Sequence, residues 1–280
     1  MLKEYLKFKN IVSNIINNHK NLRKSNKLPK SYKKNLGNSE EINHILNHKN
    51  NICLFFLNEK KIFRKYSDDK NGIKKIISEY HGLRWYCKQS GLNQKKVIKY
   101  FYNNKKYAVL DINFIKGRKI KSWKPLSENY NYLIRIFNHY KKIFKKKNLH
   151  KIHGDLTLDN VFFGDKRIFI LDWEFYGANK YLWGHDLVYL ALSSICIPFI
   201  ASGIFSKKDE KLFVKLWKIL KKMGMSRSLI YNPFAYFENV FKNDKILNAN
   251  SKISKSKFFP LITTKKFKIR ILKIINSQIH

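Results

Sequence analysis

The stretch that most constrains the fold is LVYLALSSICIPFIASGIF, residues 187–205, which contains no charged side chain. In a chain of which 28% of the residues are charged, such a stretch has to be removed from water. It is almost long enough to span a bilayer. However, Pro198, Gly203 and three serines interrupt it, and Asp186 directly precedes it. We therefore predict a buried central helix followed by a turn, and no transmembrane segment.

The net charge is strongly positive but evenly spread. The chain has 58 Lys and Arg residues against 19 Asp and Glu, which gives a formal charge of +39. A charge of this size is typical of proteins that bind nucleic acid or anionic membranes. Here the lysines occur in nearly every segment, beside abundant Asn, Ile, Phe and Tyr, as A/T-rich codons would produce without any polyanionic partner. We therefore expect no specific nucleic-acid partner, although the charge favours anionic substrates.

The cysteines and the N-terminus indicate a compartment. Cys53, Cys87 and Cys196 are far apart and form no C-x-x-C pair, which argues against a disulfide framework and against a zinc site of thiolates. The N-terminus MLKEYLKFKN alternates charged and apolar residues and lacks the apolar core of a signal peptide. We therefore expect a reducing, cytoplasmic location.

The first part of the chain combines strand patterns with a helix. Runs rich in β-branched and aromatic residues alternate with turn residues, and cap-type residues precede a run with helical spacing. The expected elements are a helix at 1–20, a polar connector at 21–40, a hairpin at 51–67 turning at Asn58-Glu59, a helix at 67–89 and a hairpin at 95–117 turning at Asn103-Asn104.

The second part is mainly helical and contains a polar loop. A helix is predicted at 128–147, and the loop HGDLTLDN follows at 153–160. The sequence VFFGDKRIFI then reads as a short hairpin. Helices are expected up to the end, the last one packed within the basic, amphipathic residues 251–273. The order of elements predicts an α+β protein.

The polar loop and the segment ILDWEF, residues 170–175, carry the residue types of a phosphoryl-transfer site. A carboxylate has to orient the attacking hydroxyl and accept its proton, and we assign this role to Asp155. Magnesium prefers oxygen ligands, which Asn160 and Asp172 can supply. The hairpin between these two residues brings them back together. We expect His153 to brace the loop through its ring nitrogens and not to act as a base.

The order H-G-D-x-x-x-x-N, hairpin, D-W-E resembles the catalytic loop and metal-binding aspartate of protein-kinase-like enzymes. Among these, the segment is similar to the aminoglycoside phosphotransferase and choline kinase superfamily, and LDWEFYGANKYLWGHDL looks most like the choline/ethanolamine kinases. The resemblance implies a bilobal kinase-like fold. Its N-lobe, residues 1–112 with an N-terminal helical extension, would be a small antiparallel sheet with one key helix that binds nucleotide. Its mainly helical C-lobe, residues 113–280, would hold the catalytic loop, the metal site and the substrate site.

The resemblance also implies a nucleotide site in the N-lobe. A strand cation should contact the α/β-phosphates, and a helix glutamate should hold that cation. Lys65 and Arg64 are both candidates for the cation, but strand neighbours point to opposite sides, so only one can face the cleft. We prefer Lys65, and Glu79 is the expected partner. DINFIKG, residues 111–117, would be the hinge whose backbone pairs with adenine, near Asn113.

Two departures from the family pattern bear on the substrate. The segment EINHILNHKNNICLFF, where the phosphate-covering turn should lie, has no Gly-rich loop. The short distance from Asp172 to Asp186 leaves no room for a long activation segment, which argues for a small-molecule acceptor. Asp186 matches a family position that we interpret as structural, capping the buried helix. Trp173 and Glu174 could form an aromatic wall and an anion for a quaternary ammonium, or could equally belong to the core.

These observations predict a kinase that uses ATP and Mg²⁺ to phosphorylate a hydroxyl group of a small molecule. Choline, ethanolamine or a related amino alcohol is the first expectation for the acceptor, followed by a sugar or an aminoglycoside. The alternative is a basic, kinase-like scaffold without catalysis, binding nucleic acid or anionic lipid. The complete set of Asp155, Asn160 and Asp172 argues against that alternative.

Overall fold

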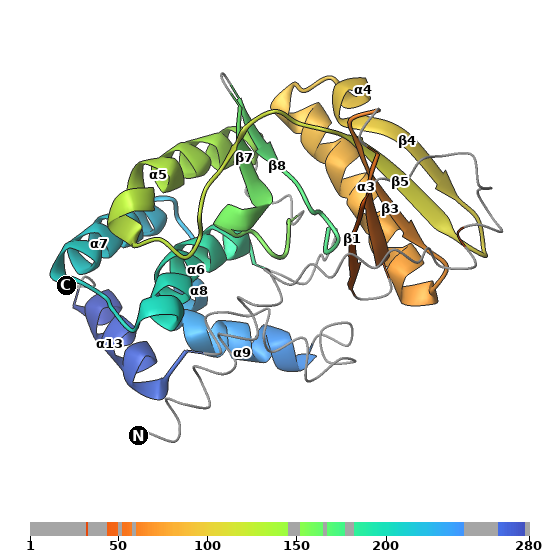
Figure 1. Ribbon diagram of the computed structural model, residues 1–280. Coiled ribbons are helices and arrows are strands. Elements are labelled where there is room, and N and C mark those ends of the chain that lie inside the picture. The colour runs from red at the N-terminus through yellow and green to blue at the C-terminus, as the bar shows by residue number, and fades with distance from the viewer. Residues whose placement is uncertain are drawn as a thin grey trace. The chain divides into compact units, whose positions relative to one another are not determined.

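The computed structural model describes residues 32, 44–49, 52–57, 60–144, 152–164, 167–176, 182–243 and 263–277. The chain forms an α+β structure and divides into two compact units (Figure 1). Unit 1 comprises Met1–Lys116 and Asp172–Tyr176, and unit 2 comprises Gly117–Leu171 and Gly177–His280. The predicted boundary after residue 112 falls within the last strand of unit 1, and the return of Asp172–Tyr176 to unit 1 is not predicted by the sequence.

Unit 1 is built on an antiparallel sheet with the strand order β1-β2-β3-β5-β4. The strands are β1 (His44–Lys49), β2 (Ile52–Leu57), β3 (Ile62–Ser67), β4 (Ile98–Asn103) and β5 (Ala108–Asn113). The pairings β2–β3 and β4–β5 confirm both predicted hairpins. The second turn lies slightly later than expected, because Asn103 ends β4 and the amide of Asn104 donates to the carbonyl of Tyr107 at 3.0 Å.

The helix predicted at 67–89 is present and packs on the part of the sheet that β3, β5 and β4 form. This helix, α3 (Lys70–Ser90), contacts β3, β4 and β5, and the short helix α4 (Gln94–Val97) follows it (Figure 1). Asp69 caps the start of α3 by accepting hydrogen bonds from the amides of Asn71 and Gly72. Gly91 ends the helix in the left-handed conformation that favours glycine, with φ of 67°.

The opposite face of the sheet is closed by a buried aromatic cluster and an ion pair. Tyr32 lies 2% exposed against Phe55 and Tyr66. The Arg64 guanidinium donates to both carboxylate oxygens of Asp111 at 2.7 Å and to the Tyr32 hydroxyl at 3.1 Å. Arg64 and Asp111 are direct cross-strand partners on β3 and β5, so strand register alone brings them together.

Unit 2 joins a small sheet to a set of packed helices. Its strands are β6 (Arg118–Lys119), β7 (Val161–Phe163) and β8 (Ile168–Ile170), and the pairing of β7 with β8 confirms the predicted hairpin. A 3-10 turn, η1 (Leu158–Asn160), precedes β7. The helices are α5 (Leu126–Ile143), α6 (His185–Ser202), α7 (Lys207–Lys222), α8 (Arg227–Tyr231), α9 (Pro233–Asn243) and α13 (Lys265–Asn276).

Helix α6 is the buried central helix that the uncharged stretch predicts. It packs against α5, α7 and α8 and ends at Gly203, where φ is 73°. By length and composition alone it could cross a membrane, but 78% of it is buried inside the structure, and the core helix of a folded domain passes the same test. Asp186 does not cap this helix as expected. The N-cap residue is Gly184, without a side-chain cap, and Asp186 lies in the first turn.

Several predictions fall wholly or partly outside the described residues. These are the helix at 1–20, the connector at 21–40, the turn at Asn58-Glu59 and parts of the helices predicted at 128–147 and 251–273. Cys53, Cys87 and Cys196 are buried and free, in agreement with the predicted lack of a disulfide framework. Burial raises the pKa of Cys87 to about 11, so this thiol is neutral and unreactive at physiological pH.

Candidate functional site

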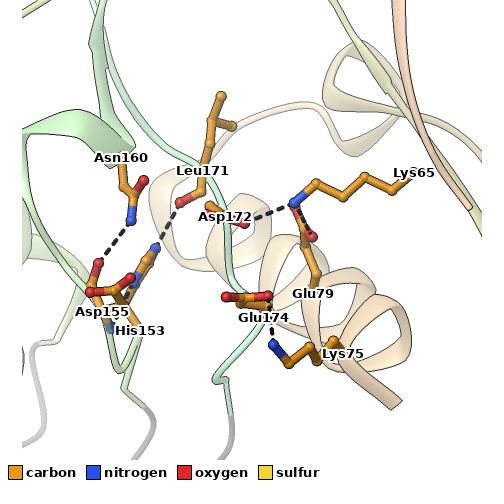
Figure 2. Close-up of polar contacts among 9 residues, drawn as sticks. All are labelled: Lys65, Lys75, Glu79, His153, Asp155, Asn160, Leu171, Asp172 and Glu174. Carbon is orange, nitrogen blue, oxygen red and sulfur yellow. Dashed lines mark hydrogen bonds and ion pairs between the residues drawn. The ribbon is translucent and has the colours of Figure 1, made fainter. Parts of the chain in front are cut away.

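Three predicted site residues meet in unit 1 and form what we call the Lys65 cluster: Lys65, Glu79 and Asp172. The ammonium of Lys65 donates to Oε2 of Glu79 at 2.6 Å and to Oδ1 of Asp172 at 2.8 Å (Figure 2). Strand alternation places Lys65 on the α3 side of β3 and its neighbour Arg64 on the opposite side. The structure therefore groups Lys65, and not Arg64, with the expected helix glutamate and metal ligand.

Burial and charge oppose each other in the Lys65 cluster. Burial alone would lower the pKa of Lys65, but the carboxylates of Asp172 and Glu79 raise it above its ordinary value, so Lys65 stays protonated. Burial raises the pKa of Glu79 to about 7, although Lys65 acts in the opposite direction. Glu79 is almost completely buried, whereas the Asp172 side chain is 42% exposed. The exposed carboxylate is therefore the member that a ligand from solution can reach.

The sequence allows the two residues after Asp172 to belong either to a ligand pocket or to the core, and the structure decides between these for Trp173. Trp173 is 1% exposed and packs among Trp85, Tyr86 and Tyr176. It is part of the core of unit 1, so it does not offer an aromatic wall to a quaternary ammonium. Glu174 lies 3.4 Å from the ammonium of Lys75 on α3 (Figure 2).

In unit 2, the side chain of Asp186 holds the start of the polar loop, residues 153–160, through hydrogen bonds to its backbone. One carboxylate oxygen of Asp186 accepts from the amide of His153 and from the hydroxyl of Tyr140, and the other accepts from the amide of Gly154, all at 2.8 Å. Gly154 has φ of 89°, a conformation that favours glycine and that the tight bend requires. Asp186 is fully buried, so its role is to fix the loop backbone.

His153 braces the loop through both ring nitrogens, as predicted. Its Nδ1 accepts from the amide of Asp155 at 3.3 Å, so the proton lies on Nε2, which donates to the carbonyl of Leu171 at 2.7 Å (Figure 2). With both nitrogens occupied and the ring fully buried, His153 is not placed to act as a base. The ring instead ties Asp155 to the residue that directly precedes Asp172.

Asn160 is oriented by the same loop. Its side-chain Nδ2 donates to the backbone carbonyl of Asp155 at 2.8 Å. The backbone carbonyl of Asn160 accepts from the backbone amide of Leu171 at 2.9 Å. The amide nitrogen therefore faces the loop, and the side-chain oxygen is the atom left for a cation. Ser122 supports the neighbouring residue by donating to Asp159 at 2.6 Å. This contact, like that of Tyr140 with Asp186, joins distant segments and is not predictable from the motif.

The predicted hinge lies at the end of β5. Asn113 donates from its side chain to the carbonyl of Lys95 at 3.1 Å. The amide of Phe114 donates to the carbonyl of Lys61 at 2.7 Å, so it is engaged within the protein. Pairing of this segment with adenine remains a prediction.

The donor chemistry fits magnesium better than zinc. Zinc is usually held by several His and Cys side chains, and among the described residues no group of three or more His, Cys, Asp or Glu could hold a metal ion of any kind. Magnesium is commonly bound by only one or two protein oxygens, together with water and substrate phosphates. The amide oxygen of Asn160 and the exposed carboxylate of Asp172 are hard donors of that kind.

Neither a family model nor a curated protein matches this chain. The resemblance to the kinase-like superfamily therefore stays a prediction that rests on the motif residues. What these residues can do has to follow from their contacts.

Proposed function

We propose that the chain is a magnesium-dependent phosphotransferase of kinase-like fold that transfers the γ-phosphoryl group of ATP to a hydroxyl of a small molecule. One observation supports this most. Lys65, Glu79 and Asp172 are assigned to three roles in phosphate and metal binding, and the Lys65 ammonium donates to both carboxylates, although Asp172 is far from it in the sequence. Unrelated surface residues of a lysine-rich chain would not be expected to meet in this way.

Lys65 and Glu79 would serve the nucleotide phosphates. A protonated lysine neutralises phosphate charge, and a buried glutamate at 2.6 Å holds its ammonium in place. Lys65 is also bonded to Asp172, so this carboxylate keeps a cationic partner before any ligand binds. Pre-positioned charges of this kind need little rearrangement during the reaction, which is the main source of rate enhancement in phosphoryl transfer.

Asp155 would orient the acceptor hydroxyl and accept its proton. As the hydroxyl oxygen forms its bond to the γ-phosphorus, the bond from that phosphorus to the ADP oxygen breaks. The loop geometry suits this role, because His153 holds the amide of Asp155 and Asp186 holds the two residues before it. The backbone of Asp155 is thereby positioned, and its side chain would contact the acceptor hydroxyl.

Asn160 and Asp172 would hold Mg²⁺ through their side-chain oxygens. Bound Mg²⁺ would neutralise charge on the β- and γ-phosphates. The two residues are connected through the backbone, since Asn160 accepts from the amide of Leu171 and Leu171 is bonded covalently to Asp172.

The acceptor is proposed to be a small molecule, such as choline, ethanolamine, a sugar or an aminoglycoside. The sequence between Asp172 and Asp186 is too short for the long activation segment on which protein kinases bind their substrates. Because Trp173 belongs to the core, recognition of a cationic head group would have to use other residues than the predicted aromatic wall.

The proposal is tested by measuring ATP turnover with magnesium against a panel of choline, ethanolamine, sugars and aminoglycosides. The Asp155→Ala variant is measured in parallel, and its thermal unfolding is checked against the wild type. We expect one class of acceptor to stimulate turnover, and the variant to lose about 10²–10⁴-fold of it. Failure of the wild type to bind magnesium-ATP would overturn the proposal, and sequence-selective nucleic-acid binding would then favour the scaffold alternative.

A further inference from the structure

Helix α3 lacks a side chain at the point where residues 172–176 pack against it. A Cβ atom at Gly82 would lie 2.5 Å from Cβ of Trp173 and 2.9 Å from Cβ of Tyr176, whereas ordinary contacts begin at 3.4 Å. These neighbours are the first atoms of their side chains, so they can move away only if their backbone moves. Glycine inside a helix costs stability relative to alanine, so its presence here points to a packing requirement.

Other contacts hold the same segment on the same stripe of α3. Ser78, one turn before Gly82, donates from its hydroxyl to the carbonyl of Tyr176 at 2.9 Å. Tyr86, one turn after Gly82, packs its ring 5.4 Å from that of Trp173. Residues spaced by four lie on one face of a helix, and Glu79 lies beside them. Helix α3 therefore holds both Glu79 and the segment that carries Asp172.

The backbone of Asp172 needs this support. Its φ is 64°, in the left-handed region that residues other than glycine adopt at a cost. Such a conformation persists only where the surrounding structure enforces it. The segment that directly follows Asp172 is the one that docks at Gly82, so its docking is the contact best placed to enforce the strained conformation.

We propose that Gly82 is a positioning residue for Asp172: the absence of a side chain at Gly82 allows Trp173 and Tyr176 to dock on α3, and this docking sets the distance of the Asp172 carboxylate from Lys65. The inference rests on the proposed function in taking Asp172 as the metal ligand. It adds that α3 positions the Asp172 carboxylate before metal or nucleotide binds. A displacement of about half an ångström would already weaken a hydrogen bond of 2.8 Å such as that between Asp172 and Lys65.

The test is the Gly82→Ala variant of the full chain, with Lys74→Ala on the exposed side of α3 as the matched control. The first readout is the Mg²⁺ concentration needed for half-maximal ATP binding, measured by titration calorimetry. We expect it to rise about tenfold in Gly82→Ala, because small displacements of site residues have effects of this size or larger. ATP affinity at saturating Mg²⁺ should change much less, and Lys74→Ala should match the wild type in both.

The second readout does not depend on any ligand. Hydrogen exchange of the peptide containing residues 172–176 should be faster in Gly82→Ala than in the wild type. The midpoint of thermal unfolding should fall, although alanine for glycine in a helix normally raises it. If Gly82→Ala does not fold, Ser78→Ala removes only one hydrogen bond of the same contact and should shift both readouts in the same direction by a smaller factor.

The outcomes separate this inference from the proposed function. Exchange and Mg²⁺ dependence equal to those of the wild type would overturn the role of Gly82, even if magnesium-ATP binds. A wild type that binds no magnesium-ATP would overturn the proposed function, and faster exchange in Gly82→Ala would then still support the docking. Weaker ATP binding that is independent of Mg²⁺ concentration would indicate general damage and would overturn the positioning role.

Discussion

The two faces of the unit 1 sheet hold two basic residues in contrasting surroundings. Arg64 and Lys65 are consecutive on β3 and point to opposite faces. Arg64 forms a two-pronged pair with Asp111, and both side chains are nearly buried, at 10% and 4% exposure. Lys65 is instead shared between Glu79 and Asp172, and the second of these carboxylates is 42% exposed.

The contrast in surroundings indicates which of the two basic residues can take part in chemistry. The guanidinium of Arg64 donates to the Asp111 carboxylate and to the Tyr32 hydroxyl. These contacts hold β3, β5 and Tyr32 together. Lys65 carries a point charge between two carboxylates, one of them open to solvent. Such a charge can be redirected to an anionic ligand at small cost. We therefore expect the Arg64 face to be structural and the Lys65 face to carry the proposed site.

Among the variants, Lys65→Met should have the largest effect on turnover. We expect turnover to fall about 10²–10³-fold, because a charge aimed at the phosphates is lost. Glu79, whose pKa burial already raises, can take up a proton in the variant, so stability should change little. Steady-state kinetics and thermal unfolding measured on the same preparation check both parts. A large loss of stability with normal activity per folded molecule would reverse the assignment.

Arg64→Met should show the opposite pattern. Removal of Arg64 leaves the buried carboxylate of Asp111 without its ion-pair partner, which is expected to cost about 3–5 kcal/mol of unfolding free energy. Denaturant titration measures this loss. The double variant Arg64→Met with Asp111→Leu should recover much of it, since no charge then stays buried. Turnover per folded molecule should stay within about threefold of the wild type, and a larger decrease would mean that Arg64 serves the site.

The pH dependence of the unfolding free energy tests the raised pKa of Glu79 in the Lys65 cluster. Burial raises the pKa of Glu79 from 4.5 to about 7, so between these values the folded protein retains a proton that the unfolded chain has released. This contribution is fully present below pH 4.5 and is lost as the pH rises to 7, by up to about 3 kcal/mol. Comparing unfolding free energies of the wild type and Glu79→Gln across this range isolates it. Parallel pH profiles would contradict the raised pKa.

Tyr32→Phe should have the smallest effect. The ring can still fill its place beside Phe55 and Tyr66, and only the hydrogen bond from Arg64 at 3.1 Å is lost. We expect a loss of about 1 kcal/mol in unfolding free energy and unchanged turnover. Tyr32→Ala, which also empties the aromatic cluster, is the control and should cost several times more. Equal losses in the two variants would show that the ring contributes little.

Local patterns were sufficient to predict the α+β elements, whereas the pairing of Lys65 with Glu79 was expected from the resemblance to kinase-like enzymes. Both hairpins of unit 1, helix α3, the β7–β8 hairpin and the buried α6 follow from periodicity, caps and turn residues. Strand alternation shows only that Lys65 and Arg64 cannot both face α3. The preference for Lys65 rests on the Tyr-Ser that follows it, which resembles the family pattern. The hairpins and helices, by contrast, depend on residues near one another in the chain, where sequence spacing determines geometry.

Features that depend on contacts between distant segments could not be predicted. A carboxylate just before an apolar helix is usually a cap, but Asp186 accepts from Tyr140, His153 and Gly154 instead. An aromatic residue after a metal ligand can line a pocket or fill a core, and only the packing of Trp173 shows the second. Gly82 is an ordinary helical glycine until Trp173 and Tyr176 are placed against it.

The most direct test of the account is the transfer of labelled phosphate. The full chain is incubated with magnesium and ATP labelled in the γ-phosphoryl group, together with the mixed hydroxyl acceptors, and labelled products are separated by mass spectrometry. We expect the wild type to form a phosphomonoester of one acceptor, and Arg64→Met to form as much of it per folded molecule. The product should be lost in Asp155→Ala and Lys65→Met. Absence of any labelled acceptor from a wild type that fails to bind magnesium-ATP, or equal labelling by Asp155→Ala, would contradict the proposed function.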